Sequence, residues 1–292
     1  MKIRDILKEK PVTISCELFP PKKESDFDSV HSAAQKIAGL RPDFISITYG
    51  AGGGTSKNTV KIASMVQEEC GVTSIAHLTC YSSTLEEVDR VIDDIKAHHI
   101  ENILALRGDP PKDSSLPLPG HYSHASELVR QIRERGDFCI GGACYPEGHV
   151  DCANRELDLD HLKEKVDAGC DFLTTQMFFD NNILYRFLYR ALSKGIDVPI
   201  LAGIMPVINA RQIQRSVQLS GTELPNRFCG IIDKFGSDPL AMKQAGIAYA
   251  TEQIIDLIAN GVHGIHLYTM NRPDIAGEIF HNLSYILGRE GD

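Results

Sequence analysis

The sequence has no apolar run that approaches the ~18 residues of a membrane-spanning helix. Its first residues, MKIRDILKEKP, lack the apolar core of a secretory signal. Basic residues are the minority, with 30 Lys and Arg against 39 Asp and Glu, and the net charge of −9 argues against a nucleic-acid or acidic-membrane surface. We therefore expect a cytoplasmic protein that binds neither nucleic acid nor membrane.

The eight cysteines form no Cys-x-x-Cys pair, and no His-x-His occurs in any apolar run. This pattern is typical of reduced, partly buried thiols, and it predicts no metal ligands. No low-complexity segment or linker divides the chain, so we expect residues 1–292 to form a single domain.

What recurs along the chain is a short apolar run followed by an amphipathic helical pattern. The predicted strands are 12–19, 43–50, 74–80, 102–108, 139–146, 172–179, 199–206 and 264–270. Apolar strands alternating with helices indicate a parallel sheet that is covered on both faces. Eight such units predict an α/β fold of the (β/α)8 TIM barrel type, with a doubly wound open sheet as the alternative.

The helical pattern is clearest at 84–99, 158–169 and 181–195. After the seventh helical pattern comes a long segment, 222–237, in which FCGIID is expected to form a strand-like turn. A second long helix is then expected at 238–260, before the last strand.

Polar side chains follow nearly every predicted strand, at the end where barrels of this kind place their active sites. They are Glu17, Thr48, His77, Arg107, Asp109, Tyr145, His149, Gln176, Tyr268 and Arg272. Taken singly, such residues are usually caps, turn formers or salt-bridge partners. Together they predict a shared polar pocket that suits a planar heteroaromatic ligand.

Glu17 is an acidic residue at the end of an otherwise apolar strand. Poor solvation there favours the protonated carboxyl, as a general acid requires, but an ion pair with an arginine such as Arg272 is the alternative. The loop YGAGGGTS (49–56) fails the G-x-G-x-x-G spacing because Thr55 stands in the place of the last glycine. It is either a flexible turn or a loop whose backbone a flat ligand can approach.

Several separated blocks of the sequence, in order from about residue 12 to 287, resemble the methylenetetrahydrofolate reductase family. These blocks are CELFPP, ITYGAGGGTS, AHLTC, ALRGDPP, YPEGH, LKEKVDAGCDFLTTQMFFD, GIMPV and HLYTMNRP. The resemblance implies a barrel that binds FAD non-covalently and reduces 5,10-methylenetetrahydrofolate to 5-methyltetrahydrofolate, with NADH or NADPH as electron donor in a ping-pong scheme. It also implies a homo-oligomer. Two alternatives stay open: electron donation by a partner protein, and a folate-binding barrel without catalysis.

By the same resemblance, Glu17 is the catalytic general acid, and Asp109 is a catalytic carboxylate between flavin and pterin. The implied substrate-binding residues are Gln176, Gln212, Tyr268 and Arg272. The implied FAD-binding residues are Thr48, Tyr49, His77, Arg107, Gly108, Asp109, Ala125, Tyr145, His149, Asp158 and Lys165. Departures from some bacterial members occur at His161, Glu164 and Ser216. The resemblance therefore does not carry over FAD-pyrophosphate contacts from the helix with His161 and Glu164, and at Ser216 a nicotinamide or folate stacking contact is either absent or supplied by another side chain.

Overall fold

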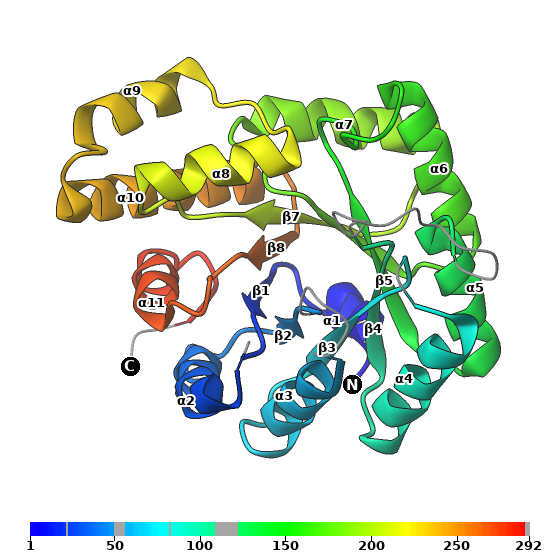
Figure 1. Ribbon diagram of the computed structural model, residues 1–292. Coiled ribbons are helices and arrows are strands. Elements are labelled where there is room, and N and C mark those ends of the chain that lie inside the picture. The colour runs from blue at the N-terminus through cyan, green and yellow to red at the C-terminus, as the bar shows by residue number, and fades with distance from the viewer. Residues whose placement is uncertain (22, 50–55, 82, 109–121, 290–292) are drawn as a thin grey trace.

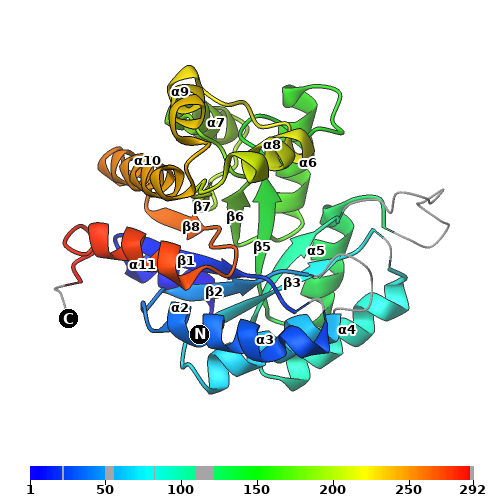
Figure 2. The same ribbon diagram turned by 60° about the vertical axis from the view of Figure 1, so that its left-hand side comes forward.

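The computed structural model describes residues 1–21, 23–49, 56–81, 83–108 and 122–289. Parallel strands close into a barrel in chain order, and helices surround it (Figures 1 and 2). The strands are β1 (Thr13–Leu18), β2 (Phe44–Ile47), β3 (Ser74–Thr79), β4 (Asn102–Leu106), β5 (Cys139–Cys144), β6 (Phe172–Thr175), β7 (Ile200–Ile204) and β8 (Gly264–Leu267). Pairing of β8 with β1 closes the ring, which confirms the predicted (β/α)8 barrel and rules out the open sheet.

The helices follow the strands as the sequence pattern predicts. Within the described residues they are α1 (Ile3–Glu9), α2 (Phe27–Ala38), α3 (Ser56–Glu68), α4 (Leu85–Ala97), α5 (Ala125–Arg135), α6 (Arg155–Asp167), α7 (Asn181–Ser193), α8 (Ala210–Ser220), α9 (Asn226–Phe235), α10 (Pro239–Ala259) and α11 (Pro273–Asn282), with a 3-10 turn, η1 (Glu24–Asp26). None of these helices combines the length and the apolar character needed to cross a membrane.

Side-chain caps set where two of these helices begin. At α4, Thr84 and Glu87 form a reciprocal capping box, in which each side chain accepts the other residue's backbone amide. At α6, the Asn154 side chain accepts from the amides of Glu156 and Leu157, so the helix begins at Arg155 rather than at the predicted residue 158.

The expected strand-like turn at FCGIID was wrong, because this segment lies within α9. Phe228 is buried, and Ile231 and Ile232, three and four residues later, pack against the same apolar cluster. This spacing is that of one helix face, and it lets α9 cover α10 without joining the sheet. The long helix that was expected at 238–260 is confirmed as α10.

The barrel interior is filled with apolar side chains at the amino ends of the strands. Ile3 of α1 is part of this cluster. The other members come one each from β2 to β7 and are Phe44, Ile75, Leu104, Cys139, Phe172 and Leu201. The Ile3 amide donates to Oδ1 of Asn102 at 2.8 Å, which fixes α1 across this end of the barrel. The amino end is therefore closed, and a ligand can enter only at the carboxyl ends of the strands.

We expect Ile3→Ala to lower the free energy of unfolding by about 3 kcal/mol, because Ile3 has no exposed surface and its loss leaves a cavity beneath the barrel. Urea denaturation monitored by circular dichroism measures this change. Lys8→Ala, at an exposed position of the same helix, is the matched control and should change stability by less than about 0.5 kcal/mol. Equal effects of the two substitutions would contradict the role given to α1.

Candidate active site

Glu17 lies inside the barrel at the carboxyl end of β1, with 7% of its surface exposed. Its Oε2 is 3.9 Å from Nε2 of His266, and its backbone carbonyl accepts a 2.6 Å hydrogen bond from Thr269. The ring of His266 in turn meets Tyr268 at an angle of 89°, with centroids 5.2 Å apart. The first and last strands together bring a carboxylate, an imidazole and a phenol to one place.

Arg272 does not form the ion pair with Glu17 that was considered as an alternative. Its guanidinium instead donates to both oxygens of Asp274, at 3.0 Å each, at the start of α11. Because Asp274 is only two residues away, this pair forms locally, and His266 is the titratable group beside Glu17. The Arg272 side chain is 47% exposed, so it stays accessible to a ligand carboxylate.

Two buried histidines of the interior are each hydrogen-bonded to a serine on a neighbouring strand. Ser15 and Nδ1 of His266 are 2.8 Å apart, and Ser46 bonds Nε2 of His77. Burial lowers the pKa of His77 to about 3, with a further contribution from His266. His77 is therefore neutral at physiological pH and can serve a ligand as a neutral hydrogen-bonding group.

A second polar cluster follows β4 and β5. Arg107 donates to Asp151 at 2.6 Å, and Nδ1 of His149 accepts from the Asp151 amide at 3.1 Å. The ring of His149 meets Tyr145 edge-on, with centroids 4.5 Å apart. Burial, followed by the charge of Arg107, lowers the pKa of His149. The cluster thus combines a guanidinium with an imidazole that resists protonation.

Helix α6 adds two more of the expected cofactor-binding residues to this cluster. Burial raises the pKa of Asp158, although a backbone hydrogen bond involving His149 opposes the shift. Lys165, two turns further along the helix, donates from Nζ to the carbonyl of Ala143 on β5. Both residues act electrostatically on His149, so α6 and the end of β5 form one side of the same site.

Four expected cofactor-binding residues lie around the ends of β2 and β4 and the start of α5. Thr48 is buried, and its hydroxyl has no hydrogen-bond partner among the described residues. Gly108 has φ +83°, and a Cβ there would lie 3.1 Å from that of Thr79, so the turn requires glycine. Ala125 is the first residue of α5, and Tyr49 packs against the core outside the barrel.

The remaining expected residues are placed in part. Gln176 directly follows β6. Its backbone amide donates to the backbone carbonyl of Cys144 at 2.8 Å, and its side-chain oxygen accepts from the backbone amide of Met177 at 3.0 Å. Asp109 lies outside the described residues, as does the side chain of Gln212, whose backbone is part of α8. These two positions stay predictions from the sequence.

Sequence reasoning missed His266 and Asp151, which contact the predicted site residues Glu17 and Arg107, and Ser15, which contacts His266. It also missed Asn271, whose side-chain amide bonds the backbone of Phe19 twice, at 2.8 and 2.9 Å, and so ties the loop after β8 to the loop after β1. A signal was present for His266, since it lies two residues before Tyr268 and therefore on the same side of the strand.

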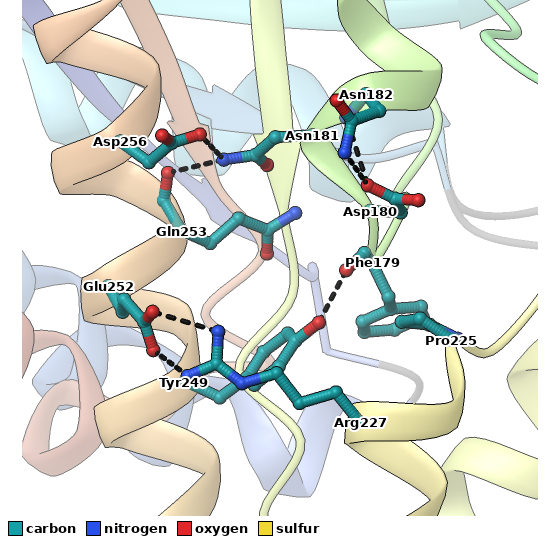
Figure 3. A pocket seen from close by; sticks show the side chains of 10 residues that line it. All are labelled: Phe179, Asp180, Asn181, Asn182, Pro225, Arg227, Tyr249, Glu252, Gln253 and Asp256. Atoms are coloured by element: carbon teal, nitrogen blue, oxygen red, sulfur yellow. Dashed lines mark hydrogen bonds and ion pairs between the residues drawn. The ribbon is translucent and has the colours of Figure 1, made fainter.

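A separate cavity of about 370 Å³ lies on the helical, outer side of the barrel between α7, α9 and α10 (Figure 3). Its polar lining groups bond one another: Arg227 pairs with Glu252, Asn181 with Asp256, and Tyr249 with the carbonyl of Phe179 (Figure 3). It contains none of the predicted site residues. Across the described ranges, no three His, Cys, Asp or Glu residues are grouped so that they could hold a metal ion.

Comparison with known families matches residues 2–284 to the family described as methylenetetrahydrofolate reductase. The chain belongs to this family. One relative, "Methylenetetrahydrofolate reductase (NADH) 1" of Arabidopsis thaliana, is 35% identical, over 98% of this chain and 50% of its own length. Another, "5,10-methylenetetrahydrofolate reductase" of Pectobacterium carotovorum, is 35% identical, over 93% of this chain and 90% of its own length. The chain thus spans about half the length of its plant relatives and most of its bacterial ones.

Solved structures similar to this family member share its fold. A Clostridium thermocellum protein, described as binding two copies of 5-methyl-5,6,7,8-tetrahydrofolic acid, has a TM-score of 0.63 at 16% identity and covers 98% of this chain. The structure of 2,3-dimethylmalate lyase has a TM-score of 0.56 at 11% identity. At such identities the likeness shows the barrel alone, and function has to be argued from the site.

The low pKa of His77 predicts a pH dependence of stability. An unfolded imidazole titrates near 6.5 and the folded one near 3, so between these values the unfolded chain binds the additional proton. The free energy of unfolding should therefore fall as the pH drops below 6.5, by up to ~1.4 kcal/mol per pH unit from this group. Urea unfolding of the wild type and of His77→Gln should show that the difference between their free energies of unfolding changes with pH with that slope. A difference that stays constant with pH would contradict the assignment.

Proposed function

We propose that this chain catalyses the FAD-dependent reduction of 5,10-methylenetetrahydrofolate to 5-methyltetrahydrofolate, with a reduced nicotinamide as electron donor. The observation that carries the proposal is the buried carboxyl of Glu17, held at the open end of a barrel that belongs to this family. Relatives that are named as NADH reductases support the choice of donor.

The chemistry requires a proton at the methylenetetrahydrofolate ring. The methylene bridge reacts only after its five-membered ring opens to an iminium cation, and this opening requires protonation of the departing ring nitrogen. Glu17 is the proposed donor of that proton, because its carboxyl lies inside the barrel at the open end, where the substrate would bind. Its carboxylate then remains beside the cationic substrate, which it stabilises.

His266 and Tyr268 surround Glu17 and set its environment. Nε2 of His266 lies 3.9 Å from the carboxylate, a distance at which it orients the charge without a direct hydrogen bond. Asp109 is proposed, from the family resemblance, to bond the pterin and stabilise the iminium cation. With the hydride received at the methylene carbon, the product is the 5-methyl compound and the ring nitrogen keeps the proton from Glu17.

The polar cluster after β4 and β5 fits FAD. The buried Thr48 hydroxyl without a partner in the described structure is a feature that a bound ligand explains. We propose that Arg107 and Lys165 bind phosphate or ring oxygens and that Asp158 binds a ribose hydroxyl. Tyr49, His77, Ala125, Tyr145 and His149 complete the proposed set. Bound FAD supplies hydride transfer, which no side chain provides.

The two substrates are proposed to bind in turn at the same place, in a ping-pong scheme. Gln176, Gln212 and Tyr268 are the proposed contacts to the folate. Arg272 is available for the carboxylate of the folate's glutamate tail, because its guanidinium is half exposed. The pair with Asp274 keeps that guanidinium oriented at the edge of the site.

An absorbance spectrum tests the cofactor first. We expect the purified protein, as isolated or after addition of FAD, to show a flavin band near ~450 nm. Anaerobic NADH or NADPH should bleach the band, and 5-methyltetrahydrofolate should bleach it in a separate experiment. Bleaching by the folate alone would assign electron donation to a partner protein. A protein that binds no FAD would refute the proposed function.

Glu17→Gln tests the acid. It should lower methylenetetrahydrofolate reduction by about 10²–10⁴-fold, because the amide cannot donate the proton, while nicotinamide oxidation with a quinone acceptor persists. Glu9→Gln, at an exposed position of α1 at the closed end of the barrel, is the control and should leave both activities unchanged. Folate reduction by Glu17→Gln at the wild-type rate would remove Glu17 from the mechanism.

A further inference from the structure

The ladder between β6 and β7 stops earlier than its neighbours. Its register pairs Leu173 with Ile200 and Thr174 with Leu201, whereas β5 pairs with β6 through Thr175 and β7 pairs with β8 through Ile204. The Leu173 amide donates to the carbonyl of Pro199 at 2.8 Å. Two residues further on, a continued parallel ladder would join the Gly203 amide to the Thr175 carbonyl.

Side chains replace that missing backbone bond. The Gly203 amide donates to the hydroxyl of Thr175 at 2.8 Å, and the Thr175 carbonyl accepts from the phenol of Tyr268 at 2.6 Å. Both backbone groups are thus satisfied, as buried polar groups must be. The consequence is that Tyr268, from the last strand, is anchored to the opening between β6 and β7.

Gly203 makes room for this arrangement. A Cβ at Gly203 would lie 2.3 Å from the Thr175 carbonyl oxygen, 2.7 Å from Cε2 of Tyr268 and 2.8 Å from its hydroxyl oxygen. Such distances are closer than van der Waals contact allows, so any other residue would have to displace either the strand or the tyrosine. The glycine is needed for space, since its backbone dihedral is not left-handed.

The phenol is a fixed donor and not a free one. Burial and the nearby Glu17 raise the pKa of Tyr268 well above its usual value, so the hydroxyl keeps its proton and its bond to Thr175. Its ring is also held by the edge-on contact with His266. Tyr268 therefore presents its ring, with its hydroxyl already engaged, to whatever binds beside Glu17.

We propose that Gly203 and Thr175 are positioning residues, which fix the Tyr268 ring as a wall of the folate site beside Glu17. The inference rests on the proposed function and deepens it, since the sequence pattern alone assigns no role to either residue. Only the folate half-reaction requires its substrate to be held against the proposed proton donor, Glu17. The two half-reactions should therefore respond differently when the wall is loosened.

Gly203→Ala and Thr175→Val test the positioning role. Each should raise the KM for methylenetetrahydrofolate about tenfold, the effect of losing about one well-placed hydrogen bond or contact, with a smaller change in kcat. Oxidation of NADH or NADPH with a quinone acceptor should stay within about twofold of the wild type. Thr175→Ser, which keeps the hydroxyl, should restore the folate KM to the wild-type value.

Matched controls separate positioning from stability. Gly230→Ala makes the same substitution in α9, where an added Cβ meets nothing within 4 Å, and should leave both half-reactions unchanged. Melting temperatures are measured for every variant, and Thr175→Val keeps the test usable if Gly203→Ala does not fold. A lowered melting temperature with an unchanged folate KM, or equal losses in both half-reactions, would overturn the inference. Absence of folate turnover in the wild type would instead refute the proposed function itself.

Discussion

The alternation of side chains along the strands of a closed barrel is the constraint on which the rest of this structure depends. Every second residue points inward, so β1 sends Ser15 and Glu17 into the same interior that β8 supplies with His266 and Tyr268. The amino end of that interior is filled with apolar side chains and closed by α1. The polar groups of the candidate site therefore gather at the carboxyl end.

Buried polar groups in that interior need hydrogen-bond partners, and burial and these partners decide what each side chain can offer a ligand. Each buried histidine is bonded to a serine of a neighbouring strand, and burial keeps His77 neutral. Glu17, in contrast, has no hydrogen bond to its carboxylate from the described residues and lies 3.9 Å from His266. Its carboxylate oxygens are therefore available to a bound ligand.

The strands, and the polar residues that gather at their carboxyl ends, could be predicted from the sequence, because apolar runs mark the core and polar residues that end them stand out. Site residues inside an apolar run were harder to identify. His266 was interpreted only as part of a strand, although it points to the same side of that strand as Tyr268. The segment FCGIID was expected to form a strand-like turn, because Pro225 precedes it and Gly230 lies inside it, but its apolar residues have the spacing of a helix. The role of Gly203 was not predictable, since it depends on contacts with Thr175 and Tyr268 that lie far away in the chain.

The bond between Ser15 and His266 joins residues 251 positions apart, and Asn271 ties its loop to Phe19 across a similar span. The side of the site that holds Glu17 is therefore assembled where β8 pairs with β1. Closing so long a loop costs conformational entropy, which these contacts have to offset. The candidate site is therefore complete only when β8 pairs with β1, so closure of the ring is a requirement of the site as well as of the fold.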